Sequence, residues 1–168
     1  FDQLTKYISD DTFFSTGKSK AIEIINGLLS IKEEISQSIL DAAGSLFLQL
    51  FEHPLLSPLH CGCLSLFTVI LSSEIEFSIE ETLIKFDIRS KIAKAFENQS
   101  RDKQYYGHLY KLTEIILENE KSESIHDDWV RYINGDFAKM QNIINSNYGG
   151  EVPSRIHNSA SGFDDRYI

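Results

Sequence analysis

Four residues of the types that bind zinc lie close together in the chain: His53, His60, Cys61 and Cys63. Zinc prefers imidazole nitrogens and thiolates, but its structural sites use Cys-x-x-Cys pairs or their longer relatives. In a helix, residues two apart point roughly 200° from each other, so the two thiols can neither share an ion nor pair together. We therefore expect no metal or other cofactor, and two reduced cysteines in a buried helix. An α-helical hydrolase or metal enzyme using His53, His60 and Cys61 is the competing enzyme hypothesis.

A second candidate is a Tyr-Gly-His-Leu tetrad at 106–109. One stripe of its helix is explained by packing, because apolar residues recur there at helical spacing. The stripe consists of Tyr105, Leu109, Leu112 and Ile116.

Tyr106, Gly107 and His108 lie off this stripe. An exposed His108 could meet a carboxylate of a partner and titrate near neutral pH; alternatively, it is a helix-start histidine that bonds nearby backbone. Gly107 costs about 1 kcal/mol relative to alanine inside a helix. We expect the close approach of a neighbouring helix to compensate for that cost.

Enzyme signatures are incomplete in this sequence. The metallophosphatase pattern Gly-Asp-x-His-Gly is represented only by Gly135-Asp136 followed by Phe137. Gly17-Lys18-Ser19 resembles the end of a phosphate-binding loop, but the glycine expected five residues earlier is Thr12, and no strand precedes it. We interpret this segment as a helix start and predict a protein without catalytic residues.

Composition and charge narrow the class of protein. The 168 residues are 42% hydrophobic, which is enough for one domain without disulfides. Sixteen basic and 25 acidic residues give a net charge of −9, which argues against nucleic acid as a partner. The longest apolar run, Leu59 to Leu71, is shorter than the roughly 20 residues that span a bilayer. We expect no membrane insertion and, from the unpaired cysteines, a cytoplasmic or nuclear location.

Helical periodicity runs through almost the whole chain, and no alternating strand pattern accompanies it, so we predict an all-α fold. Ser57-Pro58 has the form of an N-cap followed by a first-turn proline. The helix that it opens is apolar nearly all round and belongs in the middle of a stack. We expect the helical pattern to break at Asn134-Gly135-Asp136, between a helix carrying Trp129 in the core and a last helix.

Helices of about 10 to 18 residues joined by short loops favour a helical-repeat solenoid of the armadillo/HEAT type over a four-helix bundle. We assign residues 1–146 to this domain. Residues 147–168 are mostly polar and include Gly149-Gly150 and Pro153, so we predict an irregular or disordered tail. A short acidic and aromatic motif, Gly162-Phe163-Asp164-Asp165, lies near its end.

Several segments, in order, resemble the SAPS-domain family, the regulatory subunits of protein phosphatase 6 and its yeast counterpart. The likeness spans roughly the whole chain and is strongest from Leu46 to Ile133. Two loops depart from the family pattern, because 55–57 lacks its usual asparagines and 99–104 lacks its glycines. The matching segments are Leu46–Pro54 followed by Leu59-His60, Ile92–Phe96, the tetrad Tyr106–Leu109, Trp129 with Tyr132, and Gly162–Asp165.

The resemblance implies a non-catalytic scaffold that holds a type 2A-like serine/threonine phosphatase and directs it to substrates. It also implies that the chain is the C-terminal part of a longer domain and that ankyrin-type or substrate-adaptor subunits are further partners. A generic armadillo- or HEAT-like adaptor for peptides or trafficking partners is the alternative. The candidate partner-binding residues are Tyr106, Gly107, His108, His60, Phe163, Asp164 and Asp165.

Overall fold

The computed structural model describes residues 2–10, 14–29, 31, 36–72, 76–100, 102–119 and 126–146. Within these ranges the secondary structure is helical and no strand occurs, which confirms the all-α prediction. The expected tail and its residues Phe163, Asp164 and Asp165 lie outside the described residues. The helices are α1 (Asp2–Ser9), α2 (Thr16–Leu29), α3 (Gln37–Glu52), α4 (Ser57–Leu71), α5 (Glu76–Lys85), α6 (Ile88–Glu97), α7 (Tyr106–Asn119), α8 (Asp127–Tyr132), a π-helix (Ile133–Phe137) and α9 (Ala138–Asn145).

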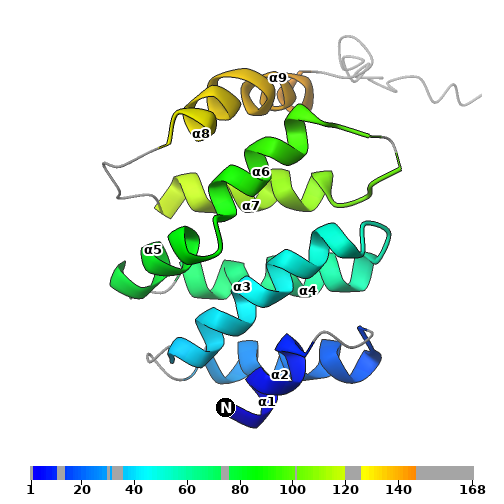
Figure 1. Ribbon diagram of the computed structural model, residues 1–168, viewed down its shortest axis with the longest axis vertical. Coiled ribbons are helices and arrows are strands. Elements are labelled where there is room, and N and C mark those ends of the chain that lie inside the picture. Colours follow the sequence, from blue (N-terminus) through cyan, green and yellow to red (C-terminus); the bar gives the residue numbers. More distant parts are fainter. Residues whose placement is uncertain are drawn as a thin grey trace, which may run out of the picture.

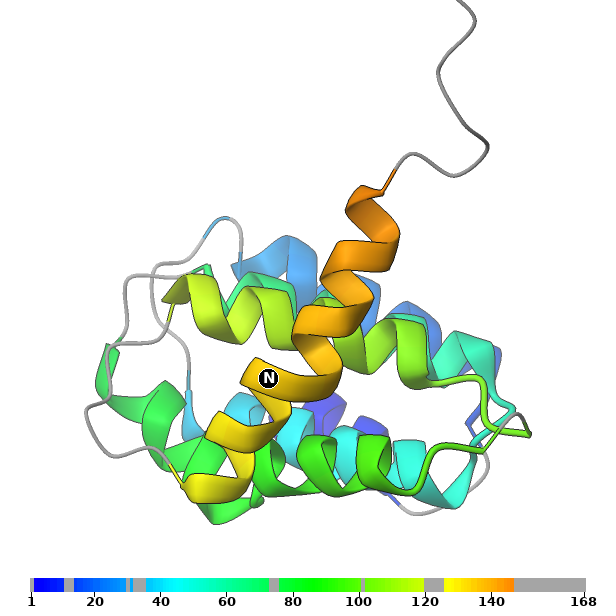
Figure 2. The same cartoon turned by 90° about the horizontal axis from the view of Figure 1, so that it is seen from above.

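Most helices pair into antiparallel hairpins that stack along the long axis of the molecule (Figure 1). The hairpins are α1–α2, α3–α4 and α6–α7, and α5 precedes the third of them. Seen from above, the hairpins form two rows (Figure 2). One row is α2, α4 and α7, and the other is α1, α3, α5 and α6. No helix within the described ranges has both the length and the apolar character that crossing a bilayer requires.

The apolar helix α4 lies in the middle of this stack, as its composition predicts. It contacts α2 on one side, α7 on the other, and α3 in the second row. Its start lies one residue earlier than predicted: Leu56 is the N-cap and Ser57 is the first helical residue. Ser57 is therefore not the N-cap, and its hydroxyl donates to Gln104 Oε1, 3.3 Å away.

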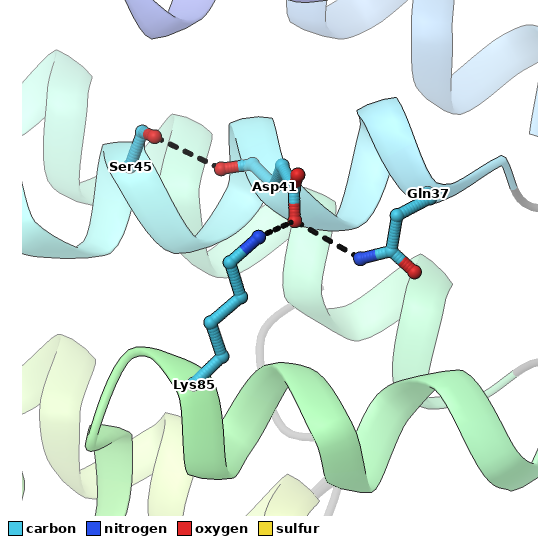
Figure 3. Close-up of polar contacts among 4 residues, drawn as sticks. All are labelled: Gln37, Asp41, Ser45 and Lys85. Atoms are coloured by element: carbon cyan, nitrogen blue, oxygen red, sulfur yellow. Dashed lines mark hydrogen bonds and ion pairs between the residues drawn. The ribbon is translucent and has the colours of Figure 1, made fainter.

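Helix α3 is joined to α5 by a polar contact and by close packing. The Asp41 carboxylate accepts hydrogen bonds from Lys85 Nζ at 2.8 Å and from Gln37 Nε2 at 2.9 Å (Figure 3). One turn further along α3, Gly44 lies directly against the Phe86 ring, where a Cβ atom would come within 2.1 Å of Phe86 Cδ2. Only a glycine leaves room for this ring at its present position.

The C-terminal helices differ from the prediction at one point. The expected break at Asn134-Gly135-Asp136 is wrong, because α8 continues through the π-helix into α9. The Ala138 N–H donates to the Ile133 carbonyl, five residues back, and this wider turn keeps the segment helical. Trp129 is buried, as predicted, and α8 packs on α6 at the end of the stack.

Candidate functional site at the α4–α7 seam

Two of the predicted site residues meet where α4 and α7 pack together. His60 lies in the first turn of α4 and His108 in the first turn of α7. These helices are neighbours in one row and begin at the same side of the stack (Figure 1), and the two imidazoles are in contact. Their ring centroids are 5.4 Å apart, with an interplanar angle of 65°. We call the contact line of these two helices the α4–α7 seam.

His60 is fully buried at the seam, so it cannot touch a partner directly, and its assignment as a contact residue is wrong. Its Nε2 lies 3.0 Å from the His53 carbonyl oxygen. Because a carbonyl only accepts, Nε2 carries the hydrogen, which leaves Nδ1 of the neutral ring as a buried acceptor without a partner. Burial lowers the pKa of His60, His108 adds to this effect, and the bond to His53 opposes it. His60 therefore ties the end of α3 to α4 as a neutral ring.

One expectation for His108, a bond to nearby backbone, is wrong, and the other, contact with a partner, stays a prediction. His108 is half-buried, and its Nε2 contacts the Sγ atom of Cys61 at 3.4 Å instead of nearby backbone. Its Nδ1 is buried and has no hydrogen-bond partner. His108 thus links α7 to α4 through a thiol, a contact that no sequence pattern indicated.

Tyr106 and Gly107 complete the tetrad in two different ways. The Tyr106 hydroxyl accepts a hydrogen bond from the Ser100 N–H at 2.9 Å, and its ring packs on Phe96 with centroids 5.3 Å apart. Gly107 is exposed, and a Cβ atom added there would meet nothing within 4 Å. The expected close approach of a neighbouring helix to Gly107 is therefore wrong. Tyr105 is buried with the rest of the stripe, which confirms that part of the prediction.

The loops that lead into α4 and α7 contact each other beside the seam. The Gln104 N–H donates to the Pro54 carbonyl at 2.9 Å, and Ser57 reaches the Gln104 side chain. Lys103 Nζ lies over the Tyr105 ring, 5.8 Å from its centroid. These contacts fix the entry to α7 on the entry to α4, so the position of His108 is defined by both loops.

The two cysteines of α4 have opposite environments. Cys63 is buried, and that burial raises the pKa of its thiol well above the usual range. Cys61 is exposed, so the expectation of two buried cysteines is wrong for this one. Sequence patterns placed Cys61 only with His53 and His60 in the enzyme hypothesis and not beside His108, although the 200° separation implied that only one of the two thiols could face the core.

The described part of the chain contains no group of three or more His, Cys, Asp or Glu residues placed to hold a metal ion. His53 contributes its backbone carbonyl to this region, and the Cys63 thiol lies in the core. The arrangement at the seam is a Cys–His pair backed by a buried histidine. In such a pair the imidazole can donate a hydrogen bond to the sulfur or accept one from the thiol.

Comparisons of the sequence with protein-family models and with curated proteins, and of the structure with solved structures, find no match.

Proposed function

We propose that the chain is part of a non-catalytic scaffold subunit that binds a type 2A-like serine/threonine phosphatase of the protein phosphatase 6 kind and directs it to substrates. The ordered motifs from Leu46 to Ile133 support the choice of partner. The stacked hairpins support the scaffold role, because an armadillo/HEAT-like solenoid presents extended helical faces to other proteins. A cytoplasmic or nuclear location fits this proposal.

The exposed surface at the tetrad carries the proposal. Gly107 contributes no side chain, and the space above it is open. His108 follows it in the chain and is half-buried, and the exposed Cys61 contacts His108. A bare stretch of helix beside polar side chains allows a partner chain to approach the backbone closely. This surface therefore offers a contact for the phosphatase at the one place where the tetrad departs from its apolar stripe.

Affinity capture with a matched pair of variants tests the proposal. The full-length protein, expressed in cells, should recover a type 2A-like catalytic subunit, identified by mass spectrometry. Gly107→Arg fills the open space and should abolish recovery without lowering the melting temperature. Gly27→Arg is the control, because Gly27 is also exposed in a helix with nothing within 4 Å of its Cβ position.

Three outcomes would contradict the proposal. Recovery of peptide-bearing or trafficking proteins without any phosphatase would favour the generic adaptor. Equal recovery by the Gly107 and Gly27 variants would remove the seam as the contact. Stoichiometric zinc or iron in the purified protein would revive the enzyme hypothesis. The segment with Phe163, Asp164 and Asp165 belongs to the same proposal as a second contact, and deletion of residues 162–168 should weaken capture.

A further inference from the structure

Cys61 and His108 form a Cys–His pair whose chemistry is separate from the partner binding proposed above. The thiol is exposed on α4, and the imidazole of α7 faces it with 3.4 Å between Sγ and Nε2. Exposed cysteines beside a nitrogen donor are the ones that react, whereas cysteines buried among apolar groups are inert. The same helix supplies an inert thiol for comparison, because Cys63 is only 1% exposed.

The protonation of His108 follows from its surroundings. A neutral imidazole carries its hydrogen on either Nδ1 or Nε2. With the hydrogen on Nδ1, a buried N–H would have no acceptor, which is rarer in proteins than an acceptor without a donor. The form with Nε2–H is therefore favoured, and it directs the hydrogen at the Cys61 sulfur. A donor in this position stabilises the negative charge that the sulfur carries when it reacts.

A second observation, independent of the thiol, concerns the histidine behind the pair. His60 is fully buried, packs its ring on His108, and has a buried Nδ1 without a partner. His108 has the same defect at its own Nδ1. Two unpaired buried nitrogens on neighbouring rings are costly, and in native proteins such groups accompany redox or catalytic roles or bound ions. Because the exposed thiol of Cys61 lies beside these rings, a redox role fits this site best.

We propose that Cys61 is a site of reversible mixed-disulfide formation with low-molecular-weight disulfides of the glutathione class, assisted by the Nε2–H of His108. The Cys61 thiolate attacks one sulfur of the disulfide. A sulfur–sulfur bond forms to Cys61 as the original bond breaks, and the released thiolate takes up a proton to replace the one that Cys61 lost. The Cys61 sulfur is oxidised, the departing sulfur is reduced, and no further oxidant is needed.

The test uses the full chain and glutathione disulfide, with intact-mass and peptide-mapping readouts. We expect one glutathionyl group per chain, located at Cys61, in both the original chain and Cys63→Ala, and none in Cys61→Ser. A hydrogen bond to the reacting sulfur changes the rate by at most roughly fivefold. Because a better stabilised thiolate is a weaker nucleophile, His108→Ala should slow the reaction only about two- to threefold. His108→Gln, which keeps an N–H donor near the same place, should retain most of the rate.

Several results would overturn the inference. One is modification of Cys63 as fast as Cys61, and another is no modification of Cys61 at all. An unchanged rate in His108→Ala would remove the role of the imidazole. Because His108→Ala loses a packing contact, its circular dichroism melt is recorded in parallel. If that variant is unfolded, the modification rates of His108→Gln and the original chain are compared under the same conditions. A rate more than threefold lower in the glutamine variant counts against the proposal.

Discussion

Replacing Gly44 by alanine tests the packing of α3 against the ring of Phe86, the residue that follows α5. The added Cβ would lie 2.1 Å, 2.2 Å and 2.5 Å from Cδ2, Cε2 and Cγ of Phe86, so the ring must move by about 1 Å or more. Overpacking costs about 1–3 kcal/mol, and contacts as short as these lie at the upper end of that range, about 2–3 kcal/mol. Alanine returns about 1 kcal/mol through its helix propensity. The net expectation is destabilisation by about 1–2 kcal/mol, which lowers the melting temperature by roughly 2–8 °C in a chain of this length.

Gly107→Ala is the matched variant with the opposite expected sign. Its Cβ would meet nothing within 4 Å, so only the propensity gain remains. We expect stabilisation by about 0.5–1 kcal/mol. Urea unfolding followed by far-UV circular dichroism measures both variants. A double-mutant cycle with Phe86→Ala assigns the cause, since Gly44→Ala should cost nothing once the ring is absent.

If Gly44→Ala is as stable as the original chain, the Phe86 ring does not lie against α3. A large loss that persists in the Phe86→Ala background would place the clash elsewhere.

Three further predictions rest on single contacts. Because burial lowers the pKa of His60, protonation favours the unfolded chain, and the free energy of unfolding should fall as the pH drops below the ordinary value of 6.5. In urea melts between neutral and mildly acidic pH, the free energy of unfolding should depend less on pH in His60→Gln than in the original chain. The hydrogen bond from Lys85 lowers the pKa of Asp41, so the charged carboxylate stabilises the fold. Because both side chains are well exposed, Asp41→Asn should cost less than about 1 kcal/mol at neutral pH. This difference should vanish as the pH falls below 3.8 and Asp41 becomes protonated. Thr113→Val should cost about 1–3 kcal/mol in the same melts, because it leaves the buried Tyr132 hydroxyl, now 3.1 Å from Thr113 Oγ1, without that partner.

Local patterns predicted much of the fold. The spacing of Tyr105, Leu109, Leu112 and Ile116 placed one buried stripe on α7, and the apolar run from Leu59 placed α4 in the middle of the stack. These features depend on periodicity within one helix, which the sequence displays directly. The N-cap of α4 was misplaced by one residue because Ser57-Pro58 has the sequence form of a cap, whereas the backbone is already helical at Ser57.

The arrangement of the seam could not be predicted from the same patterns. His60 and His108 meet only because α4 and α7 are adjacent in one row, and nothing in the local sequence specifies which helices become neighbours. The expectation that a neighbouring helix approaches Gly107 closely was wrong for the same reason, because it also depended on which helices become neighbours. The π-helix was missed because Asn134-Gly135-Asp136 has turn-forming residues, and only the tertiary packing of α8 shows that the helix continues.

The most direct measurement of the central claim is the recovery of a type 2A-like catalytic subunit by the full-length protein carrying Gly107→Arg or Gly27→Arg. We expect the Gly27 variant to recover the phosphatase as the original protein does, and the Gly107 variant to recover none, with equal melting temperatures for the two. Equal recovery by both variants, or no phosphatase with either variant or the original protein, would contradict the claim.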